Sequence, residues 1–311
     1  MSDPVAFLFP GQGSQAIGMG RELCARYPAA RRRFEEADDV LGFSLSRLCF
    51  EGPLETLTLT ENTQPALLTV SCATAQAVEA ELGLTPQWVL GHSLGEFSAL
   101  VVAGALSFAD AVRLVREGGL AMQRAVAPGV GAMAALLGLD LAAVQALCEE
   151  AAQGEVVSPA NLNGAGQIVL AGHAAAVARA VELAKQRGAR RAVPLNVSAP
   201  FHCALMQPAA ERLAQVLAGL EIQPLAVPLI ANVDAQPNSD PARVTELLVR
   251  QVCSPVRWED CVQTLAGLGC RRALEIGPGK VLTALVKRIA PAIDCTAVDD
   301  PQILRQDRVD G

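Results

Sequence analysis

The chain has 311 residues, 51% of them hydrophobic, which is enough for a large packed core in one large or two unequal domains. Its formal net charge of −7 argues against nucleic acid as the main partner. The nine cysteines are scattered without a C-x-x-C pair, a pattern typical of free thiols in a reducing cytosol rather than of a disulfide framework or a zinc site.

The first part of the chain predicts alternating strands and helices. Residues 5–9 and 88–90 are short, wholly apolar segments, as expected of strands in a buried parallel sheet. Residues 64–82 and 99–125 predict helices, the second with a break near Leu106-Ser107. The first strand runs directly into a proline and glycine, so we expect neither a signal peptide nor a membrane span.

The middle of the chain predicts a different unit, whose order is strand, helix, strand, strand, helix, strand. The expected elements are 132–139, 141–152, 156–161, 167–171, 174–187 and 190–195. A turn at Asn163-Gly164 would join the two middle strands. This order is that of the ferredoxin-like fold, so we expect an inserted subdomain at 129–197. Residues 1–128 and 198–311 would together form the larger α/β body.

The α/β pattern of the body resumes after this unit. Helices are expected at 207–217, 241–251, 258–268 and 281–289, and strands at 229–232 and 273–276. The segment Gly277-Pro278-Gly279-Lys280 lacks the spacing of a phosphate-binding loop and is better explained as a strand-to-helix turn.

A candidate nucleophile lies in the sequence Gly91-His92-Ser93-Leu94-Gly95. This G-x-S-x-G pattern follows a predicted strand and precedes a predicted helix, the setting of a nucleophile elbow. A serine at such a junction can also cap a helix without catalysis, so the pattern alone is moderately specific. Its position and its two glycines favour a nucleophile.

A serine nucleophile needs a base, and the chain has three histidines. His173 lies at a strand-to-helix turn, which suggests a surface or capping role. His92 is adjacent to Ser93, so their side chains point apart and His92 fits a pocket wall. His202, in the loop 198–202 at the subdomain junction, is the candidate base. No Asp or Glu lies near it in sequence, so the group that orients it could be a distant carboxylate or a carbonyl.

Several motifs occur together in one order along the chain. They are Phe9-Pro10-Gly11-Gln12-Gly13-Ser14-Gln15, Gly91-His92-Ser93-Leu94-Gly95-Glu96, Asn161-Leu162-Asn163, Ser198-Ala199-Pro200-Phe201-His202 and Ile276-Gly277-Pro278-Gly279-Lys280. Over residues 4–297 the chain resembles the malonyl-CoA:acyl-carrier-protein transacylases of fatty acid and polyketide synthesis. The resemblance implies an α/β class fold, with an α/β-hydrolase-like parallel-sheet body and a ferredoxin-like insert.

The resemblance also implies catalytic roles for matching positions. Ser93 is implied to form an acyl-enzyme ester, with His202 as general base and then general acid. Gln251 matches the residue whose main-chain carbonyl holds that histidine. Gln12 and Leu94 match the residues whose main-chain N–H groups form the oxyanion hole.

Further positions are implied to contact the substrate, namely His92, Asn163 and Phe201. The substrate would be a CoA or phosphopantetheine thioester, with acyl carrier protein as the partner. We expect no metal and no other cofactor, no nucleic-acid or membrane partner, and a monomer.

One position departs from the family, and we count it among the substrate-binding positions. The malonyl enzymes carry an arginine after the elbow that binds the free carboxylate of malonate, and the matching residue here is Gly118. Arg116 and Arg124 are near in sequence, but on a helix neither projects in the direction of residue 118. Burying an unpaired carboxylate costs about 3–5 kcal/mol, or about two to four orders of magnitude. The sequence therefore predicts an uncharged or longer acyl group, unless another cation compensates and the substrate is malonyl after all.

Different functions remain open at this point. The acyl group could pass to a carrier-protein thiol, the commoner activity of the family, or to water in a stand-alone hydrolase that clears stalled carrier proteins. A carrier-docking protein with a degenerate site is disfavoured because Ser93, His202, Gln12 and Gln251 are all present. A general lipase or esterase should show a triad acid and has no reason to contain the first motif.

Overall fold

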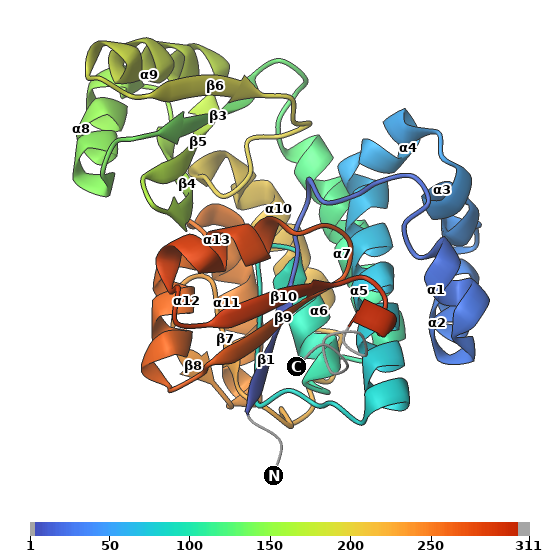
Figure 1. Cartoon of the computed structure of the whole chain (residues 1–311). Coiled ribbons are helices and arrows are strands. Elements are labelled where there is room, and N and C mark those ends of the chain that lie inside the picture. The colour runs from blue at the N-terminus through green and yellow to red at the C-terminus, as the bar shows by residue number, and fades with distance from the viewer. Residues whose placement is uncertain (1–3, 304–311) are drawn as a thin grey trace.

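The computed structural model describes residues 4–303 and contains two sheets, each with its own helices (Figure 1). The larger sheet has the strand order β10-β9-β1-β2-β7-β8. Its strands are β1 (Val5–Phe9), β2 (Trp88–Gly91), β7 (Leu229–Ile230), β8 (Pro237–Asn238), β9 (Arg272–Ile276) and β10 (Asp294–Val298). Neighbouring strands are parallel except β7 and β8, which pair antiparallel.

Strand β1 lies at the centre of this sheet, and its side chains alternate between two hydrophobic cores. Val5, Phe7 and Phe9 face one core, whereas Ala6 and Leu8 face the other. All five are buried, because parallel strands covered by helices on both faces have no solvent side. This explains why the sequence shows an unbroken apolar run rather than an alternating pattern.

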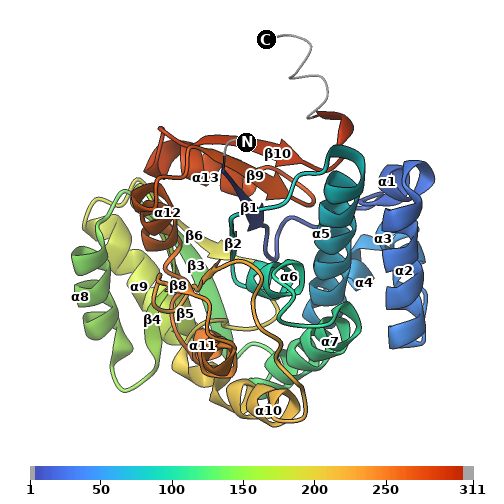
Figure 2. The ribbon, with the colours of Figure 1, turned by 90° about the horizontal axis from the view of Figure 1, so that it is seen from below.

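Helices cover both faces of the larger sheet. The helices that contribute to the first core are α2 (Pro28–Leu41), α5 (Thr60–Leu82), α6 (Gly95–Val102), α7 (Phe108–Ala125), α10 (Gln207–Leu217) and α11 (Pro241–Cys253), with the short α1 (Arg21–Arg26), α3 (Leu45–Glu51) and α4 (Leu54–Thr58). The opposite face is covered by α12 (Trp258–Gly267) and α13 (Val281–Ile289). In the view from below, α2 lies outside α5, away from the sheet (Figure 2).

The smaller sheet forms a separate unit above the body in Figure 1. Its elements are β3 (Gly131–Leu137), α8 (Leu141–Ala152), β4 (Val157–Gly164), β5 (Gln167–His173), α9 (Ala174–Gln186) and β6 (Arg191–Leu195). All pairs in the order β4-β5-β3-β6 are antiparallel, and α8 and α9 form a core with the sheet. This is the ferredoxin-like arrangement, and the predicted α/β fold class is confirmed.

The structure differs from the sequence analysis at three places, one predicted turn and two segments with elements that were not predicted. The turn expected at Asn163-Gly164 is wrong, because β4 continues through a bulge and the chain turns at Ala165-Gly166, both with positive φ. Residues 21–58 form four helices that the sequence analysis did not assign. Strand β10 was also missed, because its edge position leaves most of its side chains partly exposed.

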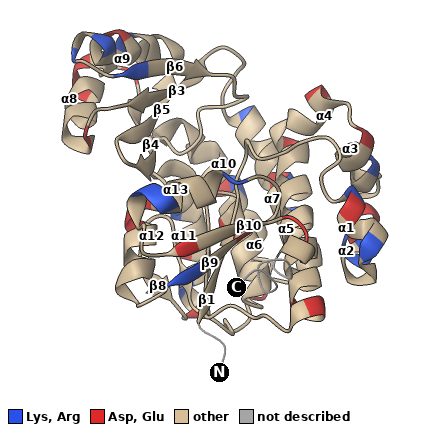
Figure 3. Ribbon diagram, viewed as in Figure 1, with Lys and Arg blue, Asp and Glu red and all other residues tan. Residues whose placement is uncertain are grey.

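Charged residues of both signs are interspersed over the outer helices, whereas the strands of the body carry few (Figure 3). Within residues 4–303, no helix is both long and apolar enough to cross a membrane.

Candidate active site

Ser93 lies in the sharp turn between β2 and α6, with φ +55°. The turn requires glycine on both sides. A Cβ on Gly91 would lie 1.9 Å from the carbonyl carbon of Gly95, and a Cβ on Gly95 would lie 2.0 Å from the carbonyl oxygen of Phe9. Real side chains do not approach backbone so closely, so the two glycines allow the strained backbone that presents Ser93.

His202 lies beside Ser93, with its Nε2 2.7 Å from the serine Oγ. Its Nδ1 lies 2.9 Å from the main-chain carbonyl oxygen of Gln251, in the last turn of α11. Because a carbonyl oxygen only accepts hydrogen bonds, Nδ1 carries the proton and Nε2 is left to accept from the serine hydroxyl. The group that orients the imidazole, left open by the residue pattern, is this carbonyl in the structure.

The electrostatic setting keeps His202 neutral. Its side chain is buried, and burial lowers its pKa to about 4, against the opposing effect of the Gln251 hydrogen bond. A neutral imidazole at physiological pH can accept a proton, so the pair has the geometry and protonation state required of a serine and its general base.

Gln12 and Leu94 line the same cavity as Ser93. The loop of Gln12 packs tightly on the elbow, since a Cβ on Gly11 would lie 2.4 Å from the His92 carbonyl oxygen. Within the described residues 4–303, neither the Gln12 nor the Leu94 main-chain N–H donates a hydrogen bond. Two unpaired donors beside a nucleophile can stabilise an oxyanion.

His92 lines the same cavity, but Asn163 does not. The Nε2 of His92 lies 2.8 Å from Asn163 Oδ1, and its ring packs against Trp258 with centroids 5.5 Å apart. The expected direct contact of Asn163 with substrate is therefore not supported. Asn163 holds His92, and Asn161 is the asparagine of β4 that lines the cavity. His173 lies away from this site, and its Nδ1 accepts from the Val156 N–H at 2.9 Å.

The cavity beyond Ser93 has a volume of about 160 Å³ and is mostly apolar. Leu114 and Met122 come from one face of α7, Leu213 comes from α10, and Val252 comes from α11. Phe201, expected to contact substrate, also lines it. Among the described residues there is no group of three or more His, Cys, Asp or Glu side chains that could hold a metal ion.

Comparisons with known proteins agree with this geometry. Residues 6–298 match the family model of the acyl transferase domain. The malonyl CoA-acyl carrier protein transacylase of Bacillus subtilis strain 168 is 52% identical over 301 residues, which are 96% of this chain and 95% of that protein. This chain belongs to the acyl transferase domain family.

Solved structures extend the similarity to the whole fold of this acyltransferase. The malonyl CoA-acyl carrier protein transacylase of Coxiella burnetii has a TM-score of 0.96 and 43% identity, covering 98% of this chain and 96% of that one. A malonyl-transacylase in complex with a type II PKS acyl-carrier protein has a TM-score of 0.95 and 45% identity, covering 98% of this chain and all of that one.

The acyltransferase has no arginine at the expected carboxylate position. Gly118 lines the cavity, and a Cβ added there would have Leu213 Cδ1 as its nearest neighbour, at 4.0 Å. Arg116 is engaged elsewhere, because it bonds to the Glu61 carbonyl oxygen at 2.8 Å and to Asn62. Arg124 lines a separate surface pocket. No Lys or Arg is among the described residues that line the cavity.

Asn232 also belongs to this site, although no motif in the sequence indicated it. Its Oδ1 accepts from the Ser93 N–H and its Nδ2 donates to the Gly91 carbonyl, both at 2.7 Å, so it clamps the elbow from β7. A signal was available, because Asn232 follows β7 and the carboxyl ends of parallel strands meet at one edge of a sheet.

Proposed function

We propose that this acyltransferase takes an uncharged acyl group from a pantetheine thioester onto Ser93 and passes it to the thiol of an acyl carrier protein. The donor is an acyl-CoA or an acyl-carrier protein. The observation that carries the proposal is the Ser93–His202 pair, with its 2.7 Å contact, in the wall of an apolar cavity that no described lysine or arginine lines.

In the acylation step, Ser93 Oγ attacks the thioester carbonyl while His202 Nε2 takes the hydroxyl proton. The Gln251 carbonyl stabilises the imidazolium through Nδ1. The negative charge on the tetrahedral oxygen is bound by the N–H groups of Gln12 and Leu94. The carbon–sulfur bond then breaks, and the leaving thiolate receives the proton from His202.

In the transfer step, the carrier-protein thiol attacks the Ser93 ester and gives its proton to His202. The ester bond breaks, and His202 returns the proton to Ser93 Oγ. The curated and solved relatives support the carrier protein as acceptor, since their names specify an acyl carrier protein and one was solved with it.

The charge of the cavity supports an uncharged acyl group rather than malonyl. Burial lowers the pKa of both His92 and His202, so neither supplies a positive charge at neutral pH. A malonyl carboxylate would be buried without a partner, at a cost of about 3–5 kcal/mol. An engineered apolar cavity of about 150 Å³ binds benzene, so an acyl chain of about six carbons or fewer fits this space.

The test is to incubate the protein separately with malonyl-, acetyl- and hexanoyl-CoA and follow the mass of the Ser93 adduct. Acetyl or hexanoyl loading should exceed malonyl loading, and Ser93→Ala should form no adduct. The acyl-enzyme is then chased with holo-acyl carrier protein or with buffer alone. Faster malonyl loading would contradict the uncharged acyl group, and equal loss in both chases would make the protein a hydrolase.

A further inference from the structure

A buried acidic group, Glu96, lies three residues after the nucleophile and takes no part in the chemistry above. Glu96 is in the first turn of α6, and its side chain is fully buried. Its Oε2 accepts from the Asn232 main-chain N–H at 2.8 Å and from Gln251 Nε2 at 2.9 Å. Its Oε1 has no partner within the described residues. Glu96 does not line the cavity, so a direct contact with substrate is not its role.

Gln251 connects this carboxyl group to the catalytic histidine. Its side chain bonds to Glu96, and its main-chain carbonyl bonds to His202 Nδ1 at 2.9 Å. This carbonyl lies in the last turn of α11, where the i+4 helical partner is missing, and its other contact is a long hydrogen bond of 3.4 Å from the Ser254 N–H. Gln251 Nε2 also lies 3.4 Å from the Ser93 carbonyl, so the same side chain contacts the elbow. Glu96 therefore lies where α6, α11 and the elbow meet.

We propose that Glu96 is a positioning residue whose carboxyl group anchors the Gln251 side chain and so aims the Gln251 carbonyl at His202. Without that anchor, the end of α11 is free to shift. A small shift of an orienting group has a large effect on proton transfer, because the hydrogen bond must stay aligned during the reaction. The proposal rests on the proposed function only in taking His202 as the base of Ser93.

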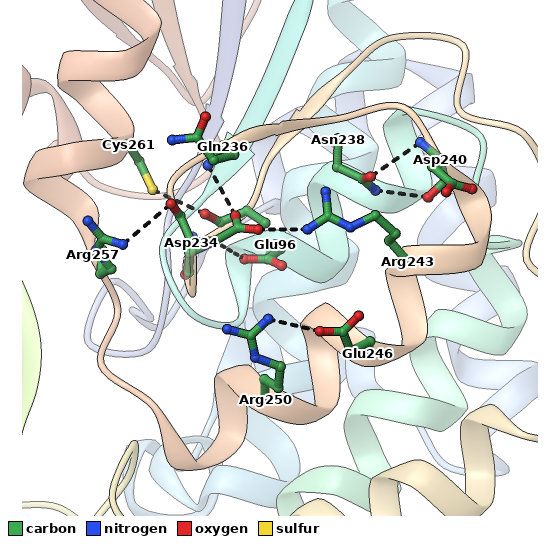
Figure 4. A network of polar contacts seen from close by, with 12 residues as sticks. Glu96, Asp234, Gln236, Asn238, Asp240, Arg243, Glu246, Arg250, Arg257 and Cys261 are labelled. Carbon is green, nitrogen blue, oxygen red and sulfur yellow. Dashed lines mark hydrogen bonds and ion pairs between the residues drawn. The ribbon is translucent and has the colours of Figure 1, made fainter.

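The groups around Glu96 determine the pH range in which its carboxyl group is ionised, and so the pH chosen for the experiment. Burial raises the pKa of Glu96 to about 7, opposed by the Asn232 and Gln251 hydrogen bonds and assisted by Asp234. Asp234 is paired with Arg243 at 2.9 Å and lies next to Glu96 (Figure 4). The nearby Cys261 thiol has its pKa raised well above 9.0 by burial, so it stays neutral. At pH 8 Glu96 is mainly ionised, and its bonds to Gln251 and Asn232 are charge-assisted.

The experiment measures how fast Ser93 reacts with a fluorophosphonate at pH 8. Ser93 Oγ attacks phosphorus, the phosphorus–fluorine bond breaks, fluoride leaves and His202 takes the proton. The variants are Glu96→Ala, Glu96→Gln, Gln251→Ala and the double variant Glu96→Ala/Gln251→Ala. We expect each alanine variant to react about 10–100-fold more slowly, by analogy with lost supporting groups. Glu96→Gln should recover part of the rate, because its carbonyl oxygen can still accept from Gln251.

The double variant tests whether Glu96 acts through Gln251. If it does, the double variant reacts about as slowly as either single one, because both changes break the same link. The proposal would be overturned if the rate reduction of the double variant equalled the product of the two single reductions, or if Glu96→Ala reacted at the wild-type rate. Circular dichroism and thermal melting identify any variant that is unfolded at the assay temperature. If Glu96→Ala is unfolded, the rates of Glu96→Gln and Gln251→Ala are compared instead.

A matched control is Glu275, which like Glu96 is a fully buried glutamate. Its carboxyl group accepts from the N–H groups of Leu282 and Thr283 at the start of α13 and has no bond to Gln251. Glu275→Gln should lower stability without slowing Ser93. The probe contains no thioester, so its reaction with Ser93 does not depend on the proposed acyl substrate. If the wild-type protein reacts with the probe but forms no acyl adduct, the proposed function is contradicted, and the rates of the Glu96 variants still test the positioning role.

Discussion

The two ends of the cavity are built on different physical principles. At the polar end, Ser93 and His202 both have positive φ, and each donates a hydrogen bond that holds it, Ser93 N–H to Asn232 Oδ1 and His202 Nδ1–H to the Gln251 carbonyl. At the other end, apolar side chains of α7 and α10 leave open space beside Gly118. At the polar end, the positive-φ backbone and the hydrogen bonds must all be in place together, so single changes there should remove activity. The apolar end tolerates changes, so single changes there should alter which acyl group is accepted.

The largest expected effect is at the polar end. His202→Ala removes the base at 2.7 Å from Ser93 Oγ, and we expect acyl-enzyme formation to slow by about 10⁴-fold or more. The measurement is the single-turnover rate of Ser93 acylation, with thermal melting as a check of folding. A loss of less than tenfold would mean that another group takes the serine proton.

A change at the apolar end should alter selectivity instead. Gly118→Arg places a guanidinium in open space beside the acyl group, so the ratio of malonyl to acetyl loading should rise by about 100-fold or more. Gly267→Arg is the matched control, since Gly267 is exposed near the end of α12 and a side chain there meets nothing within 4 Å. An unchanged ratio in Gly118→Arg would show that residue 118 does not face the acyl carboxylate.

The buried carboxyl group behind the polar end should make stability depend on pH. The pKa of Glu96 is raised from 4.5 to about 7 by burial, so the folded state stays protonated where the unfolded chain is already ionised. Ionising Glu96 should therefore cost the wild type about 3 kcal/mol of unfolding free energy as pH rises from 4.5 through 7. His92 and His202, whose pKa burial lowers, contribute in the opposite direction over this range in both proteins, so the quantity compared is the difference between the wild type and Glu96→Gln. Glu96→Gln should lack this loss. Urea unfolding of both proteins at pH 4.5 and pH 8 measures it, and an equal change in the two proteins would contradict the prediction.

The smallest expected effect is a change in folding stability at two adjacent glycines of α7, Gly118 and Gly119. A Cβ on Gly119 would lie 2.8 Å from the Glu61 Cα, whereas one on Gly118 has no neighbour closer than 4.0 Å. Gly119→Ala should therefore destabilise the fold by about 1–3 kcal/mol. Gly118→Ala should stabilise it by about 0.5–1 kcal/mol, because alanine favours helix. Thermal melting of both variants is the measurement, and the same sign in both would contradict the packing around α7.

Much of the fold could be predicted from local pattern. Some elements show their hydrophobic pattern or turn residues within a short stretch of sequence. Examples are the apolar strand 5–9, the helix 207–217 and the elements of the small subdomain. The helices of residues 21–58 were not assigned in this way. In α2 the buried residues Ala30, Phe34 and Ala37 do have helical spacing, but they are few among many charged residues, so this period is a weak signal in the sequence.

The site divides in the same way. The elbow could be predicted from local sequence, because its two glycines and the flanking strand and helix are neighbours in the chain, and the same reasoning indicated His202 as the base. How Ser93, His202 and Gln251 meet depends on the folded chain, since Ser93 and His202 are 109 positions apart and His202 and Gln251 are 49 apart. The link from Glu96 to Gln251 spans 155 positions and leaves no local pattern. Local residues form the turn that presents Ser93, whereas long-range packing brings His202, the Gln251 carbonyl and the apolar cavity to it.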